Sequence, residues 1–425
     1  MITKDNFINY FRSGIKETND CGIGIEHEKF VFLENKRADY QSILNLFEKL
    51  YEFGWKPVKE GINIIALKKG NKNITLEPGN QIELSGEKLK SIHQTCGESQ
   101  EYIFELNQSL KKLNLNLISS GFDPISKIEE VPSNPKNRYE LMTKIMPLFG
   151  KLSLDMMYRT CGTQINIDYT SEKDFCKKFF VVNRLVPITI ALFANSGIVE
   201  KNKSGYLSYR SYAWQNTYRG GLPKIFLENM DFEKYADFSL NYPMLFLKRN
   251  DKYIDAKNKT FQNFIDGDIE KASPNEEDVA DHLSTIFTEN RLKKYIEIRS
   301  MDACGWDCLC AGPAFFIGLL YGNLDEVFDV VKRWNLDEII SAYKDSPKKG
   351  LKTILGKKSI LDWSKDLFEI SKQGLENRNE LNSKKQNEVK FLDHIKTIID
   401  TNSTNAEAIM AQYQKDKNFF NINEK

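Results

Sequence analysis

Charged side chains alternate along four short segments of this chain, and side chains of these types bind cations and phosphates. In a β-strand, residues i and i+2 lie on the same face, about 6.5–7 Å apart. Glu26 and Glu28 would therefore point the same way, as would Glu297 and Arg299. The segments with this strand or turn pattern are 24–28, 76–83, 163–168 and 295–299.

Carboxylates that gather on one face of a sheet favour a divalent cation. Without a counter-charge they repel one another, and burying them costs free energy. Mg²⁺ removes that cost because it takes oxygen ligands from carboxylates and from substrate phosphates. The alternative for Glu26 and Glu28 is an exposed strand with its acids in water, but Phe30 and Phe32 share their face and favour burial. The sequence thus predicts a site on a sheet for a nucleotide with Mg²⁺, or with Mn²⁺.

Arg210 lies in the segment 200–224, which is rich in Gly, Ser, Tyr and Arg and is predicted to be a substrate loop. A guanidinium group can bind a carboxylate or a phosphate through two parallel hydrogen bonds. A surface cation is the alternative that stays open for Arg210. The chain has no G-x₄-G-K-[ST] motif and no G-x-G-x-x-G after a strand, so a bound nucleotide would not use a phosphate-binding loop of either type.

The seven cysteines are predicted to be reduced thiols, because their number is odd and their spacing is not that of a disulfide framework. Cys304, Cys308 and Cys310 form a cluster that invites a zinc or redox interpretation. The cluster lacks the paired C-x₂-C pattern and has no histidine nearby, so structural thiols are favoured over a metal-storage or zinc protein. The four histidines are too dispersed for a convincing zinc site.

The elements that would position these groups can be read from periodicity and turn residues. Residues 21–33 alternate like a strand, and residues 62–67 and 73–77 flank a polar hairpin turn. Pro78-Gly79 fits a second turn, which leads into a further strand at 81–84. The sequence therefore predicts a meander whose second turn carries two of the glutamates.

Length and charge restrict the class of protein. A chain of 425 residues exceeds the usual single domain, although elaborated α/β enzymes reach this size. Lys and Arg number 60 and Asp and Glu number 59, so the net charge of +1 implies neither nucleic acid nor a membrane surface as a partner. No stretch approaches the ~18 apolar residues of a membrane span, and the first residues show no signal or transit character. We therefore expect a cytoplasmic protein.

Taken together, the motifs resemble those of glutamate–cysteine ligase of the plant and proteobacterial type. They occur in family order over about residues 20–325, with weaker similarity to about residue 415. A collinear set of this length is far more specific than any single motif. The matching segments are GIGIEHEKF (22–30), LEPG (76–79), IELSG (82–86), HQTC (93–96), LDMMYRTC (154–161), ALFANS (191–196), LSYRS (207–211), HLSTIF (282–287), YIEIR (295–299) and CAGPAF (310–315).

The resemblance implies an α/β (α+β) fold related to glutamine synthetase, in which a curved, mainly antiparallel sheet forms a funnel with helices packed outside. It implies a single catalytic unit over residues 1–425, with a core at about 15–330 and a mostly helical part at about 331–415. It also implies a monomer or homodimer whose partners are the small molecules glutamate, cysteine and ATP.

The activity that the resemblance implies is ATP-dependent formation of γ-glutamylcysteine, the first step of glutathione biosynthesis. A carboxylate is a poor acyl donor, so ATP would first convert it to an acyl phosphate, which the cysteine amine then attacks. Two alternatives stay open: a related carboxylate–amine ligase with a different amine, and a catalytically silent binding protein on the same fold. The disulfide regulation of the plant enzymes is not carried over, because matching cysteine partners cannot be assigned.

Site residues follow from the motif positions. Arg299 would face the phosphates, and Arg210 would face glutamate or the phosphoryl group in transfer. Gln164 stands where distant members of the superfamily place a histidine ligand, so its metal role is doubtful. The expected Mg²⁺ ligands are Glu26, Glu28, Glu77, Glu83 and Glu297, and the further candidates for binding substrate or ATP are Gln164, Asn166, Arg159 and Tyr209.

Overall fold

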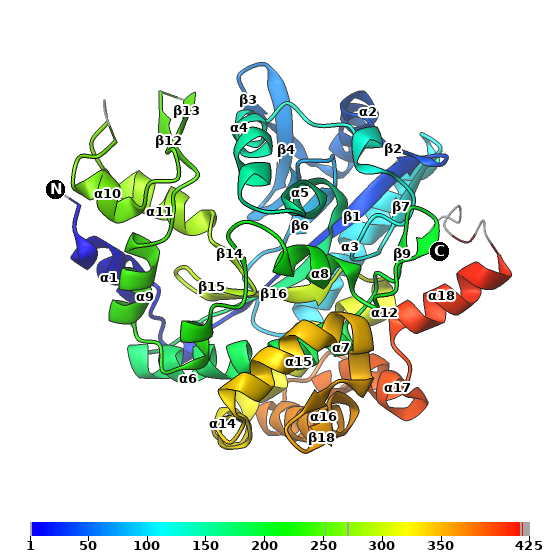
Figure 1. The fold of residues 1–425 in the computed structure, drawn as a ribbon. Helices are drawn as coiled ribbons and strands as arrows, with labels where there is room; N and C mark the ends of the chain where they lie inside the picture. The colour runs from blue at the N-terminus through cyan, green and yellow to red at the C-terminus, as the bar shows by residue number, and fades with distance from the viewer. Residues whose placement is uncertain (1, 251, 270–271, 417–418, 420–425) are drawn as a thin grey trace.

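The computed structural model describes residues 2–250, 252–269, 272–416 and 419, and a twisted sheet runs through its centre (Figure 1). In this described part, ten strands form the sheet in the order β15–β16–β8–β1–β6–β5–β4–β3, and β2 and β7 also pair with β1. Every pairing within it is antiparallel. The strands are β1 (Ile23–Leu33), β2 (Lys36–Arg37), β3 (Lys56–Glu60), β4 (Asn63–Lys69), β5 (Lys72–Leu76), β6 (Ile82–Ser85), β7 (Leu115–Ile118), β8 (Gly162–Ile167), β15 (Asn290–Leu292) and β16 (Ile296–Asp302).

The long strand β1 joins the two halves of the sheet. Its first half pairs with β6 and β8, and its second half pairs with β2 and β7. Glu26 and Glu28 point to one face, and His27 lies on the opposite face against Tyr102. Burial, assisted by the charge of Lys29, lowers the pKa of His27 to about 3, so this ring is neutral at physiological pH. The predicted strand at 21–33 and the meander that follows it are both present.

Helices cover the sheet from outside, and the described residues form two large hydrophobic cores and three smaller clusters. The smaller core lies between the sheet and helices α2 and α3, and it contains Leu46, Phe47 and Leu106. The larger core lies under α6, α7, α13 and α16. Of these helices, α6, α7 and α16 lie below the sheet in Figure 1. The helices in the first part of the chain are α1 (Lys4–Arg12), α2 (Tyr40–Leu50), α3 (Ile92–Lys111), α4 (Asn137–Ile145), α5 (Ser153–Arg159), α6 (Glu172–Arg184), α7 (Val186–Leu192), α8 (Tyr209–Gln215) and α9 (Phe232–Leu240).

The region after residue 331 is mostly helical, with one short hairpin. Its side chains Leu367 and Ile395 belong to the same large core as Ile25 of β1. The division of the chain into a core and a helical part within one catalytic unit stays a prediction. The remaining helices are α10 (Phe261–Ile265), α11 (Glu276–Ser284), α12 (Trp306–Leu309), α13 (Ala311–Ile317), α14 (Leu324–Val331), α15 (Leu336–Lys349), α16 (Ile360–Arg378), α17 (Asp393–Thr401) and α18 (Asn405–Lys415).

Short two-stranded sheets complete the structure, and one of them, formed by β11 and β14, is parallel. Among the described residues, no single helix is long and apolar enough to cross a membrane, although the bent pair Trp306–Gly322 and Leu324–Val331 meets the length and composition criteria when taken together. The short strands are β9 (Ile198–Val199), β10 (Asn202–Lys203), β11 (Gly220–Gly221), β12 (Phe246–Arg249), β13 (Lys252–Asp255), β14 (Phe287–Thr288), β17 (Ile354–Leu355) and β18 (Lys358–Ser359).

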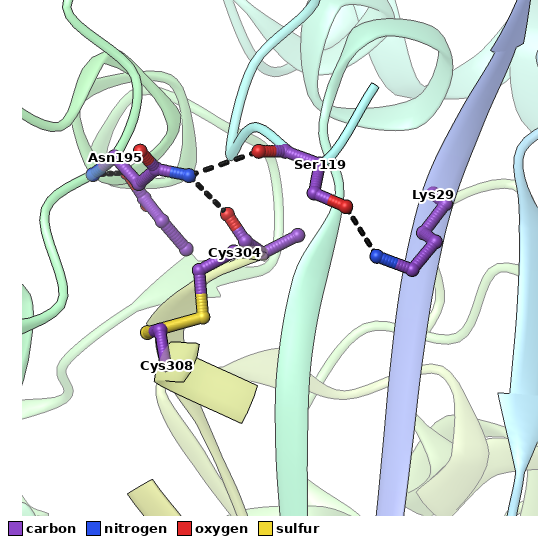
Figure 2. Close-up of a disulfide and its surroundings, with 7 residues drawn as sticks. Lys29, Ser119, Asn195, Cys304 and Cys308 are labelled. Carbon is purple, nitrogen blue, oxygen red and sulfur yellow. Dashed lines mark hydrogen bonds between the residues drawn. A yellow bond between two sulfur atoms is a disulfide. The ribbon is translucent and has the colours of Figure 1, made fainter. Parts of the chain in front are cut away.

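The cysteines correct the expectation of reduced thiols, because four of the seven form disulfides. Cys96 of α3 and Cys310 lie 214 residues apart in sequence, yet their Cα atoms are 6.0 Å apart and their sulfurs are bonded. Cys304 and Cys308 form a second, local disulfide next to the end of β16 (Figure 2). Spacing alone could not show these pairs, since the first depends on how α3 packs beside the segment that enters α13.

We expect thiol titration of protein purified without reductant to reflect these pairs. The denatured, unreduced chain should yield three thiols, from Cys21, Cys161 and Cys176. After full reduction it should yield seven. Seven thiols before reduction would contradict both disulfides, and peptide mapping would separate loss of the Cys96 pair from loss of the Cys304 pair.

Candidate active site

A cavity of about 230 Å³ opens on the face of the sheet that carries the predicted glutamates. Its wall divides by chemistry into an acid group, a cation group and an apolar group. The acid group is Glu26, Glu28, Glu77 and Glu83; the cation group is Arg138, Arg291, Lys293 and Arg299, with Glu297 among them; and the apolar group is Met142, Met156, Met157, Trp214 and Phe287.

Strand register brings the acid group together. Glu28 on β1 lies directly opposite Glu83 on β6, although 55 residues separate them in sequence. The register of β1 with β8 then sets Gln164 beside Glu26. On the far side of β8, the register with β16 sets Glu297 beside Asn166. The facing pairs across this surface are Glu28 with Glu83, Glu26 with Gln164, and Asn166 with Glu297. The structure therefore gathers on one surface the groups that the strand pattern predicted.

Neighbouring donors hold three of these carboxylates in place. The amide Nδ2 of Asn166 donates to Glu26 at 2.7 Å, and the backbone N–H of Gly162 donates to Glu28 at 2.5 Å. The hydroxyl of Thr75, which faces Glu83 across β5 and β6, donates to Glu83 at 2.8 Å. These bonds orient the carboxylates but supply no positive charge.

Among the described residues, no lysine or arginine forms an ion pair with any of the four glutamates in the acid group. Burial raises the pKa of Glu28 to about 8. The negative charge of Glu77 adds to this rise, and the positive charge of Arg210 opposes it. Burial also raises the pKa of Glu83 well above its usual value, and the charges of Glu26, Glu77 and Glu28 add to the rise. Such a group favours either protons or a bound cation.

Glu77 enters the cavity from the turn between β5 and β6. The N–H of Asn80 donates to the Glu77 carbonyl at 2.9 Å, and Asn80 adopts a left-handed backbone with φ of 60°. The turn predicted at Pro78-Gly79 is therefore present, but Asn80 takes the positive φ. Gly79 is needed for another reason: a Cβ there would lie 2.6 Å from the carbonyl oxygen of Tyr158. Close approach of the turn to α5 thus fixes where the Glu77 side chain points.

Glu297 belongs to the cation group. Its carboxylate lies 2.6 Å from Arg291, 3.1 Å from Lys293 and 3.0 Å from Arg299. Burial opposes ionisation of Glu297 most strongly, yet the three cations together hold its pKa well below the usual range. Arg299 also donates to Oε1 of Gln164 at 2.5 Å. Glu297 therefore anchors a cluster with net positive charge at one end of the cavity.

Sequence reasoning missed Arg291, Lys293, Arg138 and Tyr139. A signal for the first two was present, because Arg291 and Lys293 are spaced two residues apart just before the Glu297 strand. In the β15–β16 hairpin Arg291 faces Glu297 directly. Arg138 and Tyr139 come from α4, and the Tyr139 hydroxyl donates to Glu77 at 3.2 Å. No local pattern marks α4 as part of the site.

Arg210 corrects the expectation of a flexible substrate loop, because it lies in the first turn of α8. Its side chain is almost fully buried. Nη2 of Arg210 donates to the carbonyl of Arg299 at 2.9 Å, and the guanidinium lies 5.1 Å from the ring centre of Trp214. Arg210 thus stands directly behind the cavity wall that Arg299 and Trp214 form, and it cannot close over a substrate as a loop residue would.

Two further candidates lie away from this cavity. Arg159 pairs with Asp155 and Glu200, each at 3.0 Å. Tyr209 packs its ring against Phe122, with centres 4.7 Å apart, and does not line the cavity wall. Because both side chains have other partners, the structure does not bring them to the acid and cation groups.

The acid group suits a divalent cation that binds together with a substrate phosphate. Among the described residues, no three His, Cys, Asp or Glu side chains form a ready-made ligand cluster. Mg²⁺ in nucleotide enzymes is commonly held by one or two carboxylates plus substrate phosphates and water. Paired glutamates that repel one another, beside cations that can bind phosphate, fit a metal ion that arrives with a polyphosphate.

Comparison with solved structures supports the fold. The crystal structure of glutamate–cysteine ligase from Francisella tularensis in complex with AMP superimposes with a TM-score of 0.55 at 13% identity, covering 96% of this chain and 88% of that one. Together with the large antiparallel sheet, this match confirms the predicted fold class.

Two curated plant proteins match nearly the whole chain. The chloroplastic glutamate–cysteine ligase of Solanum lycopersicum is 38% identical over 423 residues, which cover 97% of this chain and 80% of the relative. The chloroplastic enzyme of Medicago truncatula is 39% identical over 423 residues, which cover 97% of this chain and 82% of the relative. These chloroplastic names contradict the prediction of a cytoplasmic protein, which rested only on composition and the first residues.

Family models give the same assignment as the relatives. The model of glutamate-cysteine ligase family 2 matches residues 22–421, a span that includes every strand of the large sheet and both groups of charged residues in the cavity. The chain therefore belongs to glutamate-cysteine ligase family 2.

Proposed function

We propose that this enzyme uses ATP to join the γ-carboxylate of glutamate to the amine of cysteine, which gives γ-glutamylcysteine, the first step of glutathione biosynthesis. The family and the curated relatives support the reaction. The observation that carries the proposal is the cavity itself, where four glutamates that form no ion pair within the described part of the chain face a cation group. The relatives' names also suggest a plastid as the location of this chain.

Mg²⁺, or Mn²⁺ in its place, is proposed to bind to the acid group. Glu26, Glu28, Glu77 and Glu83 would hold it, and the raised pKa values of Glu28 and Glu83 support this because a cation would relieve their repulsion. When bound, the metal would neutralise polyphosphate charge and draw electrons from the phosphoryl group. Glu297 has the weakest support of the five expected ligands, because three cations already bind its carboxylate.

The cation group is proposed to bind the phosphoryl group during transfer. The γ-carboxylate of glutamate attacks the γ-phosphorus of ATP, the bond to the β-phosphate oxygen breaks, and ADP leaves behind γ-glutamyl phosphate. Arg299, Arg291 and Lys293 would stabilise the negative charge on the transferring oxygens. Glu297 holds these side chains in fixed positions, so little reorganisation is needed when charge develops.

The second step forms the amide bond. The neutral amine of cysteine attacks the carbonyl carbon of γ-glutamyl phosphate, the C–O bond to phosphate breaks, and the nitrogen passes a proton to the departing phosphate. Hydrolysis by water would compete at that carbon. The apolar wall of Met142, Met156, Met157, Trp214 and Phe287 is proposed to limit the entry of water.

Substrate choice can be measured by ADP release from the purified enzyme with ATP, Mg²⁺ and glutamate, with candidate amines added singly. Cysteine should give rates at least about tenfold above those of other amino acids, since a fitted pocket discriminates by this order. A different preferred amine would favour the related-ligase alternative. No ADP release with any amine would favour a catalytically silent protein.

Metal binding can be tested by Glu26→Gln and Glu28→Gln, which keep the side-chain shape but remove charge. Turnover should fall by orders of magnitude, and calorimetric binding of Mn²⁺ with a non-hydrolysable ATP analogue should weaken, while the fold survives. Glu105→Gln is the matched control, because Glu105 is buried on the other side of the sheet against Trp55. Normal turnover of both cavity variants at low Mg²⁺ would refute the assignment.

The two arginines should differ in kinetics. A charge-assisted hydrogen bond contributes roughly 1.5–3 kcal/mol, which corresponds to about a 10- to 150-fold change in a rate or equilibrium constant. Arg299→Lys should chiefly lower kcat, since its contact strengthens as the phosphoryl group transfers. Arg210→Lys should raise the glutamate KM more than the ATP KM, because lysine cannot reproduce the contacts by which the Arg210 guanidinium supports the cavity wall at Arg299 and Trp214. Steady-state kinetics with each substrate varied would show the difference, and identical profiles would mean that both act on one group.

A further inference from the structure

Behind the cavity wall lies a buried carboxylate that the proposed mechanism does not use. Asp302 ends β16, is 2% exposed and does not line the cavity. It accepts three hydrogen bonds, from the N–H of Asn195 at 2.8 Å, the hydroxyl of Ser196 at 2.6 Å and the hydroxyl of Ser208 at 2.8 Å. A buried carboxylate with this many donors has a fixed orientation.

Two of these donors control the start of helix α8. Ser208 is its N-cap, and its hydroxyl oxygen accepts the N–H of Ser211 at 3.1 Å. The hydroxyl oxygen of Ser196 accepts the N–H of Arg210 at 3.1 Å while its proton goes to Asp302. Asp302 therefore ties the first turn of α8, and the backbone of Arg210 with it, to the end of β16.

The same strand carries Arg299, three residues earlier. Nη2 of Arg210 reaches back to the Arg299 carbonyl at 2.9 Å, so Arg210 is held from both its backbone and its side chain. Both guanidinium groups lie against Trp214, at 5.1 Å and 5.3 Å from the ring centre. Burial raises the pKa of Asp302, and the charge of Arg210 opposes that rise, which indicates that the two charges act on each other.

The surroundings leave Asp302 little freedom to move. A Cβ on Gly121 would lie 2.3 Å from the carboxyl carbon of Asp302, so this backbone is in close contact with it. The Asn195 amide donates to the carbonyls of Ser119 at 3.0 Å and Ala303 at 2.7 Å (Figure 2). The backbone that follows Asp302 is thereby tied, at Ala303, to the same asparagine whose N–H binds the Asp302 carboxylate.

We propose that Asp302 is a positioning residue for the ligase reaction, because it joins α8 to β16 and so aligns Arg210 with Arg299 behind the cavity. The proposal rests on the function proposed above and concerns the geometry of the arginine pair within it. Ser196 donates to one carboxylate oxygen of Asp302 and Ser208 to the other. If one oxygen is replaced by an NH2 group, one of the two serines loses its acceptor, and the first turn of α8 is free to shift. A small displacement of Arg210 is enough to shift the Arg299 backbone that it holds, and with it the alignment of the Arg299 side chain in the cavity.

Asp302→Asn tests this with little change in shape. It should lower kcat/KM for glutamate by about tenfold or more, as loss of a buried charge-assisted bond predicts. The glutamate KM should change more than the ATP KM, as for Arg210→Lys. Asp278→Asn is the matched control, because Asp278 is also buried, binds Arg249 through two hydrogen bonds of 2.7 Å and lines no part of the cavity. Both variants should lower the unfolding temperature, but only Asp302→Asn should change the kinetics.

A double-mutant cycle separates positioning from a general structural effect. If Asp302 acts through Arg210, the double variant Asp302→Asn/Arg210→Lys should lose little more activity than Arg210→Lys alone, because coupled residues are not additive. Asp278→Asn combined with Arg210→Lys should show the loss of Arg210→Lys alone, because Asp278→Asn by itself leaves the kinetics unchanged, whereas Asp302→Asn by itself does not. Multiplicative losses in the Asp302 cycle would overturn the proposal.

Other outcomes also decide the question. If Asp302→Asn does not fold, Ser196→Ala removes the hydroxyl that links Asp302 to the Arg210 backbone, and it should change the glutamate KM in the same direction. Unchanged kinetics in the folded variants, with an active unmodified enzyme, would overturn the positioning role alone. No ADP release by the unmodified enzyme would overturn the proposed function, and this inference would fall with it.

Discussion

Repulsion among carboxylates on one sheet face is the constraint on which the rest of the site depends. Register sets Glu28 opposite Glu83, and the turn after β5 brings Glu77 to the same surface. Among the residues that the structure describes, no Lys or Arg forms an ion pair with these glutamates, and burial together with the charge of Glu77 raises the pKa of Glu28 to about 8. Folding therefore stores unfavourable electrostatic free energy here, which a cation bound with a polyphosphate would release. The hydrogen bonds between the antiparallel strands and the burial of apolar side chains in the two large cores must outweigh this electrostatic free energy.

The opposite end of the cavity uses the reverse arrangement. Glu297 is one negative charge among three cations, so the cluster keeps net positive charge while each side chain has a fixed partner. Arg299 links this cluster to Gln164 in front and to Arg210 behind. Such preorganisation suits phosphoryl transfer, where the protein contributes positioning and charge rather than covalent chemistry. One strand, β16, thus supplies the anchor Glu297, the cation Arg299 and the buried Asp302.

Several features of the fold and site could be predicted from the sequence because they are local. The period-2 alternation in 21–33 predicted a strand with Glu26 and Glu28 on one face, and the polar turn residues predicted the meander that follows. The prediction of a loop around Arg210 is wrong, because the Gly, Ser and Tyr residues of this segment are typical of loops and the seven-residue helix α8 is too short to show a clear periodicity. The cysteines were assigned to the wrong chemical state because chain spacing carries no information about which α-helices meet.

The sequence by itself determined the acids of the site and the chemistry they suit: its motifs and alternating glutamates predict a ligase site on a sheet. Only the tertiary structure decided how those residues divide between the acid and cation groups. Glu297 looks like the other strand glutamates in sequence, yet the β15–β16 hairpin surrounds it with Arg291, Lys293 and Arg299. The physical reason is that a side chain's charge environment comes from strands and helices brought together by non-local packing, and residue spacing along the chain does not encode those contacts.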